Sequence, residues 1–145
     1  MAKKLNTANF FDFQIWGINS NMENYRLCWF LNQYLGWDLK RVNDIEYNNK
    51  KSKTFSTFNN YRYVNEIDFY TLELIQNKKF GNILIPELKN IDFLFLLNGE
   101  DEYFDLEEFT ALLEKIPGVQ SAIQLNINTL KSKQNLLLRH FNELY

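Results

Sequence analysis

The chain has 145 residues, of which 46% are hydrophobic and 17% aromatic, and its formal net charge is −2. A chain of this length forms one domain that buries roughly 70% of its unfolded surface without disulfides or metals. The charge excludes a strongly basic nucleic-acid clamp, and the single cysteine, Cys28, excludes an intrachain disulfide framework or cysteine metal cage. No apolar run approaches the roughly 20 residues of a membrane helix, and no signal-peptide core follows the N-terminus, so we expect a cytoplasmic protein without a membrane partner.

The first third of the chain predicts a strand, a helix and a second strand. Residues 10–18 alternate loosely between polar and apolar side chains, as a strand does. Ser20 and Glu23 have the spacing of a capping box, which predicts a helix over 21–35 that ends with Gly36 as a left-handed cap. The apolar stripe of this helix is expected to comprise Leu27, Phe30, Leu31, Tyr34 and Leu35. Residues 37–47 follow as the second strand.

The middle of the chain predicts three further strands. Residues 54–64 alternate clearly and turn into a return strand at 67–75. The most continuous apolar run of the sequence covers 91–97, is interrupted only by Asp92 and ends at an Asn-Gly turn. A run of this kind is typical of a strand buried on both faces, so we expect it at the centre of the sheet.

The last third predicts a helix over 105–116, a strand over 119–127 and a final helix capped by Asn128 or Thr129. The resulting order, β-α-β-β-β-β-α-β-α, contains two strand-helix-strand units whose right-handed crossovers place their helices on the same face. We therefore predict a single α+β domain over residues 1–145. It has an antiparallel-dominated sheet with helices on one face, in a ferredoxin-like plan with an extra C-terminal helix. The pattern leaves open whether that last helix packs on the same face or exchanges with a partner chain.

A segment past the midpoint of the chain contains two triplets, Ile85-Pro86-Glu87 and Ile91-Asp92-Phe93. It resembles the signature of the bacterial IPExxVDY family, named for its I-P-E-x-x-V-D-Y motif, and the chain length also suits that family. Three residues separate Glu87 from Ile91 where the name has two, and Ile91 and Phe93 stand in place of Val and Tyr. The resemblance implies a small bacterial protein; the family has no assigned activity, so no catalytic residue carries over.

Glu87 and Asp92 are the candidates for chemistry in this segment. Two converging carboxylates could bind a metal or act as a general acid and base. In the structural alternative, Asp92 accepts hydrogen bonds from backbone N–H groups left unpaired near Pro86, and Glu87 caps the turn or pairs with Lys89 or Arg26. We favour the structural role, because a site needs further polar partners that the sequence does not supply.

Two other polar sets were considered as sites. The acidic residues between 100 and 105 lack the spacing of a calcium loop and suit a solvated turn at a helix N-terminus. Cys28 lies on the inner stripe of the first helix and His140 near the end of the last, so a Cys–His enzyme is not indicated. The sequence indicates no cofactor.

Aromatic and basic residues gather in the hairpin over 54–64, and five of them could form a stacking platform for single-stranded RNA: Phe55, Phe58, Tyr61, Arg62 and Tyr63. The alternative is a hairpin with one aromatic face in the core. The glycine-flanked aromatic motif of RNA-recognition domains is missing, and a platform also needs an open sheet face.

We expect a non-enzymatic module that binds a protein partner or a second copy of itself. The supports are the surplus of 13 Phe and 8 Tyr, a free sheet face implied by helices on one side, and the lack of an assembled catalytic set. RNA binding through the hairpin is the alternative. A small-molecule enzyme that uses Glu87 and Asp92 comes third.

Overall fold

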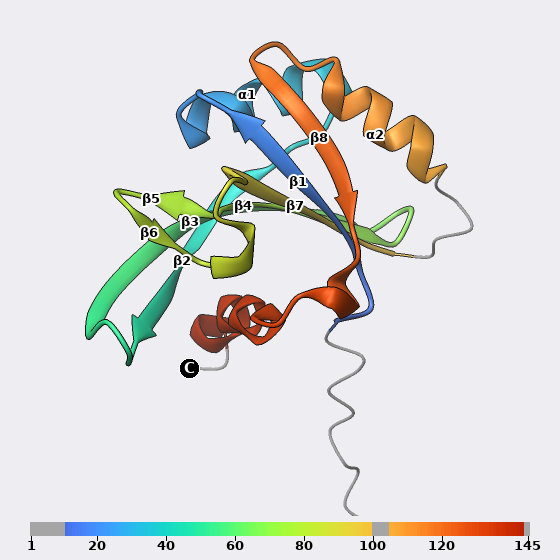
Figure 1. Ribbon diagram of the computed structural model, residues 1–145. Helices are drawn as coiled ribbons and strands as arrows, with labels where there is room; N and C mark the ends of the chain where they lie inside the picture. Colours follow the sequence, from blue (N-terminus) through green and yellow to red (C-terminus); the bar gives the residue numbers. More distant parts are fainter. Residues whose placement is uncertain (1–10, 100–104, 144–145) are drawn as a thin grey trace, which may run out of the picture.

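The computed structural model describes residues 11–99 and 105–143 and shows a chain folded around one six-stranded sheet (Figure 1). In spatial order the strands are β2 (Lys40–Asn49), β3 (Thr54–Asn65), β4 (Tyr70–Gln76), β7 (Phe93–Asn98), β1 (Gln14–Ser20) and β8 (Val119–Leu125). Every neighbouring pair is antiparallel. A separate small hairpin consists of β5 (Lys78–Lys79) and β6 (Asn82–Ile83). The predicted single α+β domain with an antiparallel-dominated sheet is confirmed.

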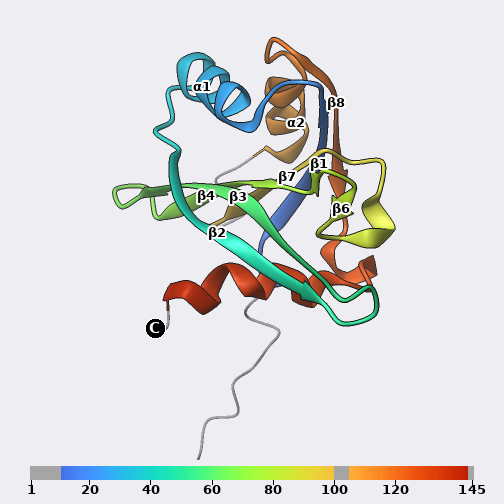
Figure 2. The same cartoon turned by 90° about the vertical axis from the view of Figure 1, so that its left-hand side faces the viewer.

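Helices cover both faces of this sheet (Figure 2). α1 (Asn24–Leu35) and α2 (Leu106–Glu114) lie together on one face, as predicted. The C-terminal 3-10 helix η5 (Lys133–Glu143) packs on the opposite face, the position that the sequence left open. The expectation of a free sheet face is therefore wrong, because η5 and the short 3-10 turns η2 (Pro86–Leu88) and η4 (Ile127–Thr129) lie on that side.

Each face of the sheet has its own apolar core. The core beneath α1 and α2 includes Trp16 and Phe95, and the core beneath η5 includes Ile15 and Leu94. β7 contributes to both cores, because side chains alternate along a strand and all of its apolar residues are buried. The apolar run over 91–97 was predicted to be the central strand, and this is confirmed, since β7 pairs with both β4 and β1.

Helix α1 begins later than its capping-box pattern predicts. Ser20 is the last residue of β1; its Oγ accepts a hydrogen bond from the Met22 N–H at 3.1 Å and donates one to the Gly118 carbonyl at 2.8 Å. Glu23 precedes the helix without a side-chain cap. Ser20 thus joins β1 to the turn before β8 instead of capping α1. The left-handed cap at Gly36 is confirmed by its φ of 69°.

Helix α2 has the expected acidic start. The side chain of Asp105 accepts hydrogen bonds from the N–H groups of Glu107 and Glu108, at 3.1 and 3.2 Å. The helix ends at Glu114, and the chain turns through Gly118, whose φ is 86°, into β8. The rest of the acidic stretch, residues 100–104, lies outside the described residues. The final helix starts at Lys133, after the separate turn η4, and not at residues 128–129.

Candidate functional site

The segment that resembles the family signature is held by one buried amide, Asn77, directly after β4. Its Nδ2 donates hydrogen bonds to the carbonyls of Leu88 and Ile91, at 3.0 and 2.8 Å, and its Oδ1 accepts one from the Ile85 N–H at 3.0 Å. The Asn77 N–H also donates to the Asp92 carbonyl at 2.9 Å. Because the side chain of Asn77 is fully buried and paired with three backbone groups, it closes the segment into a loop and plays a structural role.

Asp92 accepts a hydrogen bond from a backbone N–H, as the structural alternative predicts, but the donor lies on β1 and not near Pro86. Its Oδ2 accepts a hydrogen bond from the Ser20 N–H at 3.0 Å, which ties the start of β7 to the end of β1. Its Oδ1 lies 3.8 Å from Nζ of Lys78, a partly exposed pair that contributes little to stability. The carboxylate therefore organises the backbone at the entry to the central strand.

Glu87 also binds backbone, but in a different part of the molecule. Its Oε2 accepts a hydrogen bond from the Ser132 N–H at 2.6 Å, so the partners considered from the sequence, Lys89 and Arg26, are not the ones it binds. Desolvation opposes ionisation of Glu87, yet hydrogen bonds from its own backbone and from Ser132 and Lys131 outweigh it and hold the pKa of this carboxyl below its ordinary value. Glu87 thus anchors the segment that leads into η5.

The structure assembles no metal or nucleophile site from these residues. Within 11–99 and 105–140, no group of three or more His, Cys, Asp or Glu is placed to hold a metal ion. Burial, together with the charge of Asp38, raises the pKa of the Cys28 thiol to about 11, so the thiol stays protonated. Cys28 lies in the core beneath α1, whereas His140 belongs to η5 on the opposite face of the sheet.

The five residues considered as an RNA-stacking platform do not share one surface. Phe58 is buried in the core beneath η5, and Tyr61 is buried in the core beneath α1 and α2. Phe55 is 63% exposed at the start of β3, while Tyr63 is half-buried. Because alternate side chains of β3 enter two different covered cores, the hairpin does not present an RNA-stacking platform.

An ionic cluster beneath η5 was missed by the sequence analysis. Glu73, on β4, accepts a hydrogen bond from Nε of Arg139 on η5 at 2.7 Å and another from Nε of Arg62 at 2.9 Å. Arg139 also donates to the Leu136 carbonyl at 2.6 Å, and its guanidinium lies 5.1 Å from the ring centroid of Phe13. Glu73 is the one charged residue in the otherwise apolar stretch 72–75, and this pattern could have indicated a buried ion pair. The cluster fastens η5 to the sheet.

Three exposed aromatic side chains of α1, those of Tyr25, Trp29 and Tyr34, lie around Phe30, which is partly buried against the core; we call these four residues the α1 aromatic surface. Tyr25, Trp29 and Tyr34 are 67%, 55% and 61% exposed. The ring of Trp29 meets Phe30 edge-on at 5.0 Å, and the Phe30 and Tyr34 centroids are 6.1 Å apart. The prediction that Tyr34 belongs to the inner stripe is wrong, since the inner side is formed by smaller residues such as Leu27 and Leu31.

Arg26 lies within this surface. Together with Tyr25, Trp29 and Phe30 it lines a shallow pocket of about 420 Å³. Other strongly exposed apolar side chains in the described part of the chain lie at hairpin turns, as Ile67, Phe69 and Phe80 do, or singly on strands, as Phe55, Val64 and Ile123 do. The α1 aromatic surface differs from these because its residues lie along one regular helix, where the ring of Phe30 contacts those of Trp29 and Tyr34.

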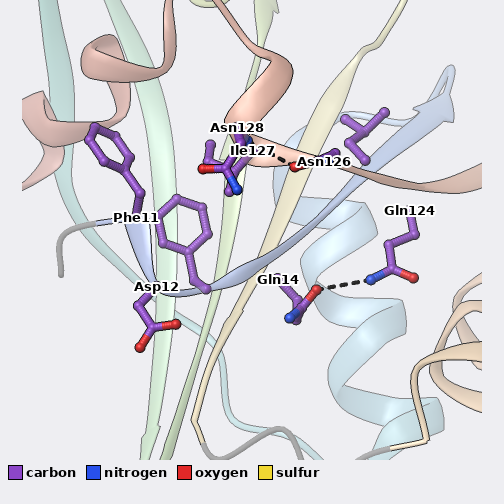
Figure 3. A pocket seen from close by; sticks show the side chains of 9 residues that line it. Phe11, Asp12, Gln14, Gln124, Asn126, Ile127 and Asn128 are labelled. Atoms are coloured by element: carbon purple, nitrogen blue, oxygen red, sulfur yellow. Dashed lines mark hydrogen bonds between the residues drawn. The ribbon is translucent and has the colours of Figure 1, made fainter. Parts of the chain in front are cut away.

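A polar hollow of about 480 Å³ lies where β1 begins and β8 ends (Figure 3). Its amides are largely engaged with one another or with backbone: Gln124 Nε2 donates to Gln14 Oε1 at 2.9 Å, and Asn126 Oδ1 accepts from the Asn128 N–H at 3.0 Å. The carboxylate of Asp12 lies at its margin. These contacts define a turn and bring together no set of groups aimed at a ligand.

No protein-family model, curated protein or solved structure matches this chain. Among the described residues, every helix is too short or too polar to cross a membrane. Functional inference therefore depends on the arrangement of side chains described above.

Proposed function

We propose that the protein is a non-enzymatic interaction module that binds a protein partner through the α1 aromatic surface. The observation that carries the proposal is the composition of that surface. Tyr, Trp and Arg are the residues most enriched where interface energy concentrates, and Tyr25, Arg26 and Trp29 stand together on one helix. Covering each large ring contributes about 1.5–3 kcal/mol of transfer free energy, before the cost of association.

The surface also defines the chemistry of the partner. A protruding apolar side chain fits the shallow pocket between Tyr25 and Trp29. No ion pair joins Arg26 to another residue of 11–99 or 105–140, so its guanidinium is available to a carboxylate. The partner is therefore a protein segment with an exposed apolar side chain and a nearby acidic residue.

The two other functions have less support. RNA binding through the hairpin has fewer aromatic side chains available, because Phe58 and Tyr61 are buried in the two cores. An enzyme that uses Glu87 and Asp92 would need the two carboxylates to converge on one site, but each accepts a hydrogen bond from the backbone of a different segment. The raised pKa of Cys28 likewise supports a role without nucleophilic chemistry.

Family and fold assignments finer than α+β are also part of this proposal. The crossover β7-α2-β8, with β1 between its strands and β4 on the other side of β7, supports a ferredoxin-like plan to which β2 and β3 are added. The signature-like loop held by Asn77 supports membership of the IPExxVDY family, and with it a bacterial, cytoplasmic origin.

Affinity capture from native cell extract, with and without nuclease, tests the function. Trp29→Ala should lower recovery of the partner about tenfold or more, because truncation of a central aromatic residue at an interface commonly has that effect. Phe55→Ala is the matched control, since it removes an equally exposed aromatic ring from another element. Equal recovery with both variants, or recovery that nuclease abolishes, would contradict the proposal.

A further inference from the structure

The two edges of the sheet differ in how they resist pairing with another strand. The β2 edge carries charges, including Lys40, Arg41 and Glu46, and its register with β3 shifts between Val42 and Ile45. Charges and irregular register are the usual means by which an edge strand avoids intermolecular pairing. The β8 edge, Val119–Leu125, has the sequence V-Q-S-A-I-Q-L and contains no charge and no proline. It is the edge that another strand can join.

The direction of the backbone groups on β8 follows from β1. The Ile18 carbonyl accepts a hydrogen bond from the Asp92 N–H, so the backbone groups of Ile18 point toward β7. Those of Gly17 therefore point the other way, toward its partner Ile123 on β8. Ala122 and Gln124 alternate with Ile123, so their N–H and C=O groups point away from β1, to the side where the described residues add no further strand.

These outward groups match a second copy of the same strand. With a two-fold axis at Ala122, an antiparallel copy places Ala122 opposite Ala122 and Gln124 opposite Gln120. The register shift near Ser20 leaves Gln120 without a partner on β1. Ile123, which is 53% exposed, would then face Ser121 of the second copy, so no charge is buried.

Helix α2, which packs against β8, carries a second self-complementary feature (Figure 1). Its exposed residues Glu108, Ala111 and Leu112 and its C-cap residue Lys115 follow the i, i+3, i+4, i+7 spacing of one helix side; we call these four residues the α2 stripe. Ala111 and Leu112 lie at the centre of the stripe, and the oppositely charged Glu108 and Lys115 lie at its two ends. An antiparallel copy therefore sets Glu108 against Lys115 twice, a complementarity that an unrelated strand does not offer.

One two-fold axis can relate both the β8 strands and the α2 stripes of the two copies, because the two features are centred at similar distances from the turn that joins them. Measured from the turn at Gly118, the centre of the α2 stripe lies about 9–10 Å back along the helix and Ala122 about 13 Å along the strand. Pairing of one seven-residue strand covers less than the roughly 800 Å² per partner of a standard interface, so contact between the α2 stripes is needed to complete it.

We propose that two copies of the chain form a two-fold dimer through the β8 edge and the α2 stripe, joining their sheets into one continuous antiparallel sheet. This goes beyond the proposed function, because the self-association surface is separate from Trp29 and from the partner chemistry that the α1 aromatic surface selects.

Sedimentation velocity of the full chain over micromolar concentrations is the first test. The wild type should sediment as a dimer, and Gln124→Pro as a monomer, because proline removes an N–H that the internal ladder does not use. Gln124→Ala is the matched control: it also loses the bond to Gln14 but keeps the N–H, and should remain a dimer. A wild-type monomer at all concentrations, or a dimer that survives Gln124→Pro, overturns the proposal.

A charge-reversal cycle on the α2 stripe adds a readout that does not depend on strand stability. Glu108→Lys or Lys115→Glu alone should raise the dimer dissociation constant several-fold, because like charges then face each other. The two reversals together restore opposite charges and should restore the wild-type value. Failure of the double variant to recover overturns the proposed pairing. Trp29→Ala should leave the dimer dissociation constant unchanged. The proposals for the α1 aromatic surface and for the β8 edge can therefore be tested independently.

Discussion

The two faces of the sheet are covered by different physical means. Beneath α1 and α2, aromatic rings fill the core: Trp37 stacks against Phe95 at 5.4 Å and against Phe109 at 5.6 Å. Beneath η5, an apolar core surrounds the buried pair of Glu73 and Arg139, whose side chains are 7% and 4% exposed. The stability of the first face depends on the volume and the buried area of apolar side chains. The stability of the second face depends also on the geometry of a few polar contacts.

The difference determines what each face can tolerate. Apolar packing is non-directional, and swaps that conserve volume usually cost less than about 1.5 kcal/mol. A buried ion pair adds little net stability, but removal of one partner leaves an uncompensated charge and costs about 3–5 kcal/mol. On the η5 face this applies to Glu73 and Arg139. Asn60, two residues after Phe58 on β3, lies on the same face; it is fully buried, and its side-chain amide has no hydrogen-bond partner in the described part of the chain.

Glu73→Ala should produce the largest loss of stability. It leaves Arg139 and Arg62 facing each other on the η5 face, so we expect the free energy of unfolding to fall by about 3–5 kcal/mol in urea denaturation. The isosteric Glu73→Gln should still cost about 2 kcal/mol, because the charge and not the volume is lost. A loss below about 1 kcal/mol for both variants would show that η5 is held by apolar packing alone.

Asn77→Ala tests the loop on the same side of the sheet. The change leaves the carbonyls of Leu88 and Ile91 and the N–H of Ile85 without their partner, and should lower the free energy of unfolding by about 3 kcal/mol. Hydrogen exchange should show faster opening over residues 84–92. An unchanged exchange rate there would mean that the loop is held by other contacts.

Phe109→Leu measures the tolerance of the opposite face. Phe109 packs against the rings of Trp16 and Trp37 in an apolar core, so replacement by the smaller apolar leucine should cost only about 1–1.5 kcal/mol in the same urea experiment. A cost equal to that of Glu73→Ala would erase the distinction between the two faces.

Glu87→Gln should give the smallest effect and the one that depends on pH. Because the folded pKa of Glu87 lies below its ordinary value of 4.5, its ionised form stabilises the fold above that pH. The stability difference between wild type and variant should be below about 1 kcal/mol at neutral pH and should vanish as pH falls through the folded pKa. A difference that persists at lower pH would point to a cause other than ionisation.

Local pattern was sufficient to predict most of the fold. Alternation located the strands, and the run over 91–97 identified the centre of the sheet. The same alternation misled for Phe58 and Tyr61, because both faces are covered and neither side of β3 is the outer one. The roles of Ser20 and Glu73 depend on partners 98 and 66 residues away, Gly118 and Arg139, which no local window contains.

The placement of β1 between β7 and β8 has a consequence for the order of folding. The meander β2-β3-β4 pairs residues close in sequence, whereas Gln14 pairs with Leu97 and Ile15 with Leu125. Contacts of high sequence separation form late, because the loop must close before they are made. During synthesis, therefore, the first strand of the chain should be the last to find its neighbours, with Trp16 and Ile18 unprotected until then. Pulse-labelled hydrogen exchange during refolding should show β3 and β4 protected before β1; simultaneous protection would contradict this order.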